Sequence, residues 1–116
     1  MTASDPEQLT AKRCIPCEGG SVMPLSIQEG ERLIQQVSGW GHATDWRSIH
    51  KDFRFASFLD AIHFVNEAAR LAEEEGHHPD LDIRYNRVSV NLTTHAIGGL
   101  SLNDFIMAAK LDSISV

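Results

Sequence analysis

Long apolar runs are missing from this chain of 116 residues. A helix that crosses a membrane needs roughly 20 consecutive apolar residues, and no stretch approaches that length. The first residues also lack the basic stretch and apolar core of a secretory signal, so we expect a cytoplasmic protein. A chain of this length can bury about two-thirds of its unfolded surface, which is enough for one domain.

Positive charge is scarce as well. The chain has 10 Lys and Arg residues against 16 Asp and Glu residues, a formal net charge of −6. The basic residues form no cluster. Direct binding to nucleic acid or to an anionic membrane surface depends on such a cluster, so the sequence predicts neither.

Cysteine is limited to Cys14 and Cys17, in a C-x-x-C spacing. A structural zinc site usually needs four ligands, and no second Cys or His pair follows at finger spacing. A redox dithiol would be expected after a strand in a βαβ unit, which is absent from the pattern. We therefore interpret the pair as non-essential, with a metal or redox role as the alternative.

The cysteines lie in a stretch without hydrophobic periodicity. Residues 1–25 contain Pro6, Pro16 and Pro24, together with Gly19 and Gly20. Such composition is typical of loops and chain ends. We predict a flexible or surface-draped leader over residues 1–25 and a single domain over residues 26–116.

Three helices are predicted, and each begins at a serine followed three residues later by an acidic residue, at Ser26, Ser57 and Ser101. Gly76 is a typical C-terminal residue for the middle helix. The apolar stripe of that helix is predicted to contain Phe58, Ile62, Val65, Ala69 and Ala72.

Alternating apolar and polar residues predict the strands. Residues 46–55 alternate clearly, whereas the glycine-rich residues 40–43 make a weaker first strand. Residues 81–92 are typical of a hairpin turning at Asn86-Arg87, with His95 at the far end of its second strand. The order α-β-β-α-β-β-α predicts an α+β fold, a four-stranded antiparallel sheet with helices packed on one face.

The stretch most unusual for a purely structural role is Glu75-Gly76-His77-His78-Pro79. An unperturbed imidazole titrates near 6.5, so histidines grouped in one pocket can donate and accept protons near neutral pH. We predict an acid–base site formed by His77, His78 and His95. A metal site from the same residues is less favoured, because adjacent side chains in an extended segment point to opposite sides. A third interpretation is that the His-His-Pro turn is only a structured connection.

The spacing of these residues resembles the activity-linked pattern of the pterin-4a-carbinolamine dehydratases. Every gap of that pattern is matched by Glu73, His77-His78-Pro79, Tyr85, His95 and Asp104. The similarity covers about residues 25–112. The resemblance implies the same α+β fold that the order of elements predicts.

The resemblance also implies an activity. Members of this family are hydro-lyases that dehydrate 4a-hydroxytetrahydropterin, the 4a-carbinolamine, to quinonoid dihydropterin. The reaction recycles the cofactor of aromatic amino-acid hydroxylases. The expected partners are therefore a pterin substrate, a functionally linked hydroxylase and further copies of the chain in a homo-dimer or homo-tetramer. No metal and no cofactor are expected.

The resemblance implies roles for the histidines. Elimination needs an acid for the departing water and a base for the proton on N5. By similarity His77, His78 and His95 line the pterin pocket and divide these roles. We favour His78 and His95 as the proton-transfer pair, with His77 positioning or protonating the hydroxyl. Which histidine is the acid and which the base stays open.

The supporting positions have alternative interpretations. Glu73 could orient a histidine or belong to a solvated run of glutamates. Tyr85 could pack in the core or form a pocket wall, and Asp104 could cap its helix, make a catalytic hydrogen bond, or do both. Pro79 is expected to fix the histidine turn.

The resemblance to this family also implies two alternative functions. Its animal members also act as dimerisation cofactors of a homeodomain transcription factor, so a protein-binding module is the main alternative. A pterin-related role in molybdenum cofactor metabolism is the third.

Overall fold

The computed structural model describes residues 9–15 and 23–116. In chain order its elements are α2 (Ile27–Ile34), β1 (Gly41–His42), β2 (Ile49–Arg54), α3 (Phe58–Glu75), β3 (Asp80–Arg84), β4 (Arg87–Leu92), the short 3-10 helix η2 (His95–Ile97) and α4 (Leu102–Asp112). The strands form one antiparallel sheet in the order β1-β2-β4-β3. The predicted α+β fold is confirmed.

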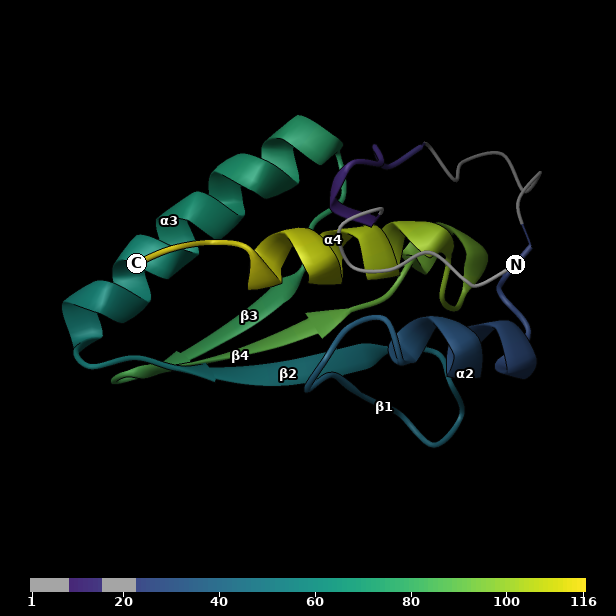
Figure 1. Cartoon of the computed structure of the whole chain (residues 1–116), viewed down its shortest axis with the longest axis horizontal. Helices are drawn as coiled ribbons and strands as arrows, with labels where there is room; N and C mark the ends of the chain where they lie inside the picture. Colours follow the sequence, from purple (N-terminus) through teal and green to yellow (C-terminus); the bar gives the residue numbers. More distant parts are fainter. Residues whose placement is uncertain (1–8, 16–22) are drawn as a thin grey trace.

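The core lies between one face of the sheet and the helices, and α3 and α4 lie over that same face (Figure 1). On β4, Val88, Val90 and Leu92 are buried while the residues between them are only half-buried, as expected for a strand with one covered face. From α4, Phe105 and Met107 are fully buried. The opposite face of the sheet carries exposed polar side chains such as Asp52.

Local capping explains where the helices begin and end. The side chains of Ser26, Ser57 and Ser101 each accept a backbone hydrogen bond at the start of α2, α3 and α4, as predicted. Gly76 ends α3 with a left-handed backbone (φ 65°), which glycine adopts without steric cost. The direction in which the chain leaves α3 is therefore encoded in a few neighbouring residues.

The predicted apolar stripe of α3 is correct only in part: Ala72 is buried, and Val65 is half-buried and packs against the core. The residues of α3 that are buried are Ala61, Phe64, Ala68 and Ala72. Phe58 is 51% exposed, and Ala69 is also exposed. The helix is turned so that the Phe64 ring lies 4.6 Å from the ring of Phe53 on the sheet. The packing of Phe64 against Phe53 therefore determines which side of α3 faces the core.

The hairpin turns one residue earlier than predicted. Arg84 pairs with Arg87, so the turn consists of Tyr85 and Asn86. Tyr85 has a positive φ of 51°, which two-residue hairpin turns require at their first position. The Asn86 side chain donates to the Phe55 carbonyl oxygen (2.9 Å), and the Asn86 carbonyl accepts from the Phe55 amide (2.9 Å). These contacts to another segment fix the turn.

His95 does not extend a strand, contrary to the prediction. β4 ends at Leu92, and Thr94 then forms an isolated bridge with Gly99. Between them the chain makes the single turn of η2, which is followed by the cap residue Gly98 with a left-handed backbone (φ 69°). Because Thr94 and Gly99 pair with each other, the segment between them must form a loop.

Part of the predicted leader lies against the domain. Residues 9–15 are described, and Leu9 is fully buried in the core. Cys17 and the rest of the stretch up to residue 22, like residues 1–8, lie outside the described residues. The domain division at residue 25 stays a prediction. Within the described part of the chain, no helix is both long and apolar enough to cross a membrane.

Candidate active site

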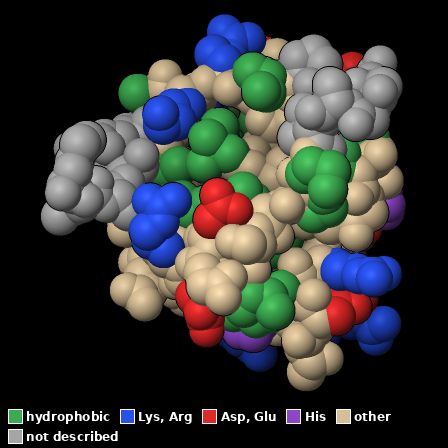
Figure 2. All heavy atoms as spheres, turned by 90° about the vertical axis from the view of Figure 1, so that its right-hand side faces the viewer, with side chains coloured by type: hydrophobic (Ala, Val, Ile, Leu, Met, Phe, Trp, Pro, Cys, Tyr) green, Lys and Arg blue, Asp and Glu red, His purple; other side chains and the backbone are tan. Residues whose placement is uncertain are grey.

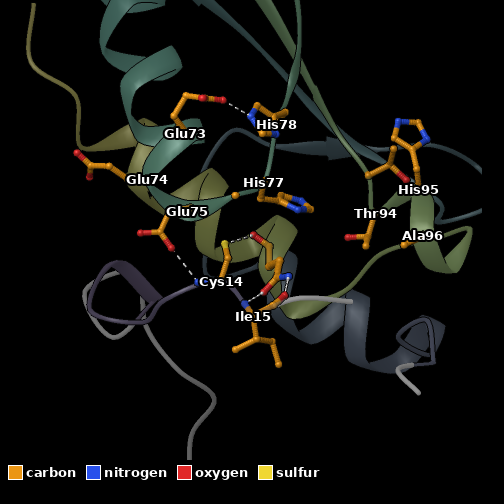
Figure 3. Close-up of a pocket in the computed structure, with 13 residues that line it drawn as sticks. Cys14, Ile15, Glu73, Glu74, Glu75, His77, His78, Thr94, His95 and Ala96 are labelled. Carbon is orange, nitrogen blue, oxygen red and sulfur yellow. Dashed lines mark hydrogen bonds and ion pairs between the residues drawn. The ribbon is translucent and has the colours of Figure 1, made fainter. Parts of the chain in front are cut away.

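A hollow of about 570 Å³ opens where α3 ends and α4 begins. Pockets for small molecules measure roughly 300–1,000 Å³, so its size is appropriate for a single small ligand. Four segments line it, and their residues are Cys14, Ile15, Glu73, Glu74, Glu75, Gly76, His77, His78, Thr93, Thr94, His95, Ala96 and Asn103. Figure 3 shows His77 and His78 on the chain leaving α3, with Thr94 and His95 across the hollow.

The left-handed turn at Gly76 separates the two adjacent histidines from the helix. After it, the His77 amide still donates to the Ala72 carbonyl (3.2 Å), and the chain then runs on to β3. Consecutive side chains of an extended segment diverge. The His77 side chain is accordingly 11% exposed, whereas that of His78 is 61% exposed. The pair thus presents one fixed and one solvated imidazole.

A buried carboxylate holds His77. Its Nε2 lies 2.7 Å from Oδ1 of Asp104, which is fully buried. The other Asp104 oxygen accepts from the Thr94 hydroxyl (2.8 Å) and the Ser101 amide (3.0 Å). Burying a charge is costly unless such partners surround it. Asp104 therefore caps α4 and anchors the imidazole at the same time.

This bond determines what His77 can offer a ligand. A carboxylate only accepts hydrogen bonds, so Nε2 of His77 is the donor toward Asp104. In the neutral ring, Nδ1 is then the acceptor. The fixed ring can accept a hydrogen bond at Nδ1 when neutral and donate one when protonated.

Glu73 is placed beside His78. Its Oε2 lies 2.5 Å from Nε2 of His78, and both side chains are exposed. Exposed pairs of this kind add little to stability. The consequence is orientation of the His78 ring, which is one of the two roles considered for Glu73 from the sequence.

Glu75, in contrast, is almost completely buried. Its carboxylate accepts from Lys110 Nζ (2.8 Å) and from the Cys14 amide (2.8 Å), and it forms an ion pair with Arg13 (3.2 Å). Burial alone would raise the pKa of Glu75. The hydrogen bonds from Lys110 and Cys14 and the two cations outweigh burial and hold that pKa below its ordinary value of 4.5.

Cys14 presents a neutral side chain beside the hollow. Burial is the main reason that its thiol pKa rises to about 12, and the negative charge of Glu75 adds to it. Its Sγ lies 3.7 Å from the Asn103 carbonyl oxygen. A thiol with this pKa is not a nucleophile near neutral pH.

The structure brings some predicted residues together and not others. Glu73, His77, His78 and His95 line the hollow, and Asp104 lies directly behind His77. Pro79 follows His78 where the chain enters β3. Tyr85 is 70% exposed at the hairpin turn and is not among the lining residues, so a role in this hollow stays a prediction without structural support.

Sequence reasoning did not place Ile15, Thr94 or Asn103 at the site. It noted Glu75 only as the start of the histidine stretch, and Cys14 only as half of a C-x-x-C pair. The remaining signals were that Thr94 precedes His95 and that Asn103 lies within a capping box. In residues 9–15 and 23–116, no three His, Cys, Asp or Glu side chains are grouped as a metal site would require.

Comparison with known proteins gives a consistent result. Residues 23–114 match the family described as pterin 4 alpha carbinolamine dehydratase. A relative from Halorhodospira halophila, whose name also refers to this enzyme, is 46% identical over 106 residues, covering 91% of this chain and 96% of that protein. Pterin-4-alpha-carbinolamine dehydratase 2, mitochondrial, from Arabidopsis thaliana is 40% identical and covers 93% of this chain and 59% of that protein.

A solved structure is similar as well. The transcriptional coactivator/pterin dehydratase from Brucella melitensis superposes with a TM-score of 0.75 at 33% identity, covering 78% of this chain and 96% of that one. Sequence and fold therefore agree: the chain belongs to the pterin 4 alpha carbinolamine dehydratase family.

Proposed function

We propose that this chain is a hydro-lyase that dehydrates 4a-hydroxytetrahydropterin to quinonoid dihydropterin. The observation that carries the proposal is the grouping of three histidines around one hollow, with one of them anchored to a buried carboxylate. Family membership supports it, because relatives at 40–46% identity carry the name of this enzyme.

The reaction needs two proton transfers. One proton goes to the C4a hydroxyl, the C4a–O bond breaks and water departs, while a base removes the proton on N5. His78 and His95 are both exposed, so they can exchange protons with solvent between turnovers. They are the favoured proton-transfer pair, and the anchored His77 positions or protonates the hydroxyl. This scheme uses no metal and no cofactor.

The wider role follows from the same proposal. The product is the form of pterin that a reductase can return to aromatic amino-acid hydroxylases, so the enzyme would act in cofactor recycling in the cytoplasm.

Self-association is part of the proposal. β3 is an edge strand of the sheet, and α3 exposes Phe58 and Leu59. Both features are typical of surfaces that pair between protomers.

A second candidate is a protein-binding module. The exposed apolar residues Phe58 and Leu59 favour it, and the similar Brucella melitensis protein is described as a transcriptional coactivator as well as a pterin dehydratase. The two candidates use different surfaces, because neither residue lines the histidine pocket. A partner captured equally by wild type and His78→Ala would support the module.

The deciding experiment is stopped-flow absorbance with freshly generated 4a-hydroxytetrahydropterin. Wild type should accelerate the dehydration, and His78→Ala and His95→Ala should each lower kcat by about 10²- to 10⁴-fold, the usual contribution of a general acid or base. His63→Ala is the matched control, because His63 is exposed on α3 and does not line the pocket.

Circular dichroism should show that all variants are folded. A folded wild type that leaves the rate of dehydration unchanged would refute the enzyme proposal. Retention of full activity by both His78→Ala and His95→Ala would refute their assignment as the proton-transfer pair.

A further inference from the structure

One wall of the pocket is built by a segment that is far from the histidine turn in sequence. Cys14 and Ile15 line the same hollow as His77 and His78 (Figure 3). The segment precedes the region that matches the family, which begins at residue 23. No position of the dehydratase pattern falls on it.

Two buried side chains fix this wall from different helices. Asn103 on α4 accepts from the Ile15 amide through Oδ1 (3.0 Å) and donates to the Ile15 carbonyl through Nδ2 (2.6 Å). Glu75 on α3 accepts from the Cys14 amide (2.8 Å). Both polar groups of the Ile15 backbone are thus held by one amide, an arrangement that defines position and orientation together.

The surroundings of Glu75 reinforce this attachment. Its carboxylate also pairs with Lys110 (2.8 Å) and with Arg13, the residue before Cys14 (3.2 Å). Arg13, whose side chain is mostly exposed, therefore adds a second cation beside the Glu75 carboxylate. Figure 2 shows the face of the molecule that lies on the right in Figure 1, where groups of hydrophobic side chains lie among separate acidic and basic side chains.

The wall differs chemically from the parts of the pocket that carry the histidines. Its thiol has a pKa of about 12 and remains uncharged near neutral pH, whereas His77, His78 and His95 line the same pocket with imidazole rings. A pterin is an uncharged heterocycle with hydrogen-bonding edges. A neutral wall can contact such a ring without competing for the protons that the histidines transfer.

We propose that Cys14 and Ile15 form a substrate-contacting wall of the pterin pocket, and that Asn103 and Glu75 are positioning residues that hold this wall in place. The inference rests on the proposed function for the identity of the ligand. The segment before the family region then belongs to the binding site, and it contributes to affinity rather than to proton transfer.

The test combines kinetics with amide hydrogen exchange measured by NMR on the full chain. Asn103→Ala removes both bonds to Ile15, and Glu75→Gln weakens the attachment of Cys14 from the other helix. Each should raise KM about tenfold, as expected when one or two ordering hydrogen bonds are lost. Each should lower kcat less than it raises KM, because the wall binds ground state and transition state alike. Asn66→Ala, an exposed asparagine of α3 outside this pocket, is the matched control.

Hydrogen exchange provides a readout without turnover. In wild type, a fully oxidised pterin, which cannot undergo the elimination, should slow exchange of the Cys14 and Ile15 amides at least about tenfold. The Asn86 amide, in the hairpin turn away from the pocket, should not change. In both variants the exchange of the Cys14 and Ile15 amides should be faster than in wild type.

The outcomes separate this inference from the proposed function. Pterin binding without protection of Cys14 and Ile15 would refute the wall, even if the enzyme is active. Faster exchange in Asn103→Ala or Glu75→Gln with KM unchanged would refute it too. Protection by pterin in a protein without turnover would support the wall and refute the dehydratase. If Asn103→Ala does not fold, Glu75→Gln and the wild-type protection experiment decide.

Discussion

Buried residues behind the pocket determine how rigidly the His77 imidazole is held in place. The Thr94 hydroxyl donates to Asp104 (2.8 Å) and lies 2.8 Å from the Ser101 hydroxyl. All three side chains are buried. Because Asp104 also holds His77, Thr94 supports the imidazole through one intermediate carboxylate.

Thr94→Val tests this support, since it keeps the shape of the side chain but removes the donor. A buried acceptor that loses a partner costs about 1–3 kcal/mol, so the free energy of unfolding should fall by that amount in urea titrations. The exposed Thr44→Val is the control and should change little. Equal stabilities of the two variants would show that the Thr94 bond is energetically neutral.

At the scale of elements, the end of α3 sets the direction of both adjacent histidines. The helix stops at Gly76, whose φ of 65° is unfavourable for residues with a Cβ, although no atom lies within 4 Å of the Cβ position. Any substitution penalty there is a backbone penalty and not a clash.

Gly76→Ala should therefore lower the free energy of unfolding by about 1–2 kcal/mol, measured by chemical denaturation. Gly76→Asn should cost less, because asparagine tolerates the left-handed region. If both variants matched wild type, the left-handed cap would not contribute to stability. Activity should decline in the same order, because strain at Gly76 is relieved by moving His77 and His78.

The helices show which structural features can be predicted from the sequence alone. The caps at Ser26, Ser57 and Ser101 were predictable because donor and acceptor lie within three residues. The rotation of α3 was not, because the packing of Phe64 on Phe53 decides it. Short sequence patterns carry no information about contacts between residues on different elements.

The same limit applies to the site. The histidines and Asp104 follow a pattern of fixed spacing, so the sequence contained them. The Cys14–Glu75 bond joins residues 61 positions apart, and the Ile15–Asn103 bond joins residues 88 positions apart. No periodicity or motif links such positions, so only the folded chain reveals that they meet.

At the scale of the whole molecule, the proposed self-association places α3 at an interface. Sedimentation equilibrium at micromolar concentration should give a dimer or tetramer, and Leu59→Lys should shift it toward monomer by placing a charge on the exposed apolar part of α3. Asn66→Lys, a charge at a polar exposed site on the same helix, is the control. A monomeric wild type would contradict the proposal.

The buried carboxylate of Glu75 has a consequence for proton linkage. Its folded pKa lies below the ordinary 4.5, so its contribution to stability is complete above that value and is lost as the pH falls through the folded pKa. Between about pH 5 and 8, where unperturbed histidine is the side chain that titrates, Glu75 stays ionised and Cys14 stays protonated. The attachment of residues 13–15 is therefore constant over this range, and a pH–rate profile measured there reports on groups other than Glu75 and Cys14.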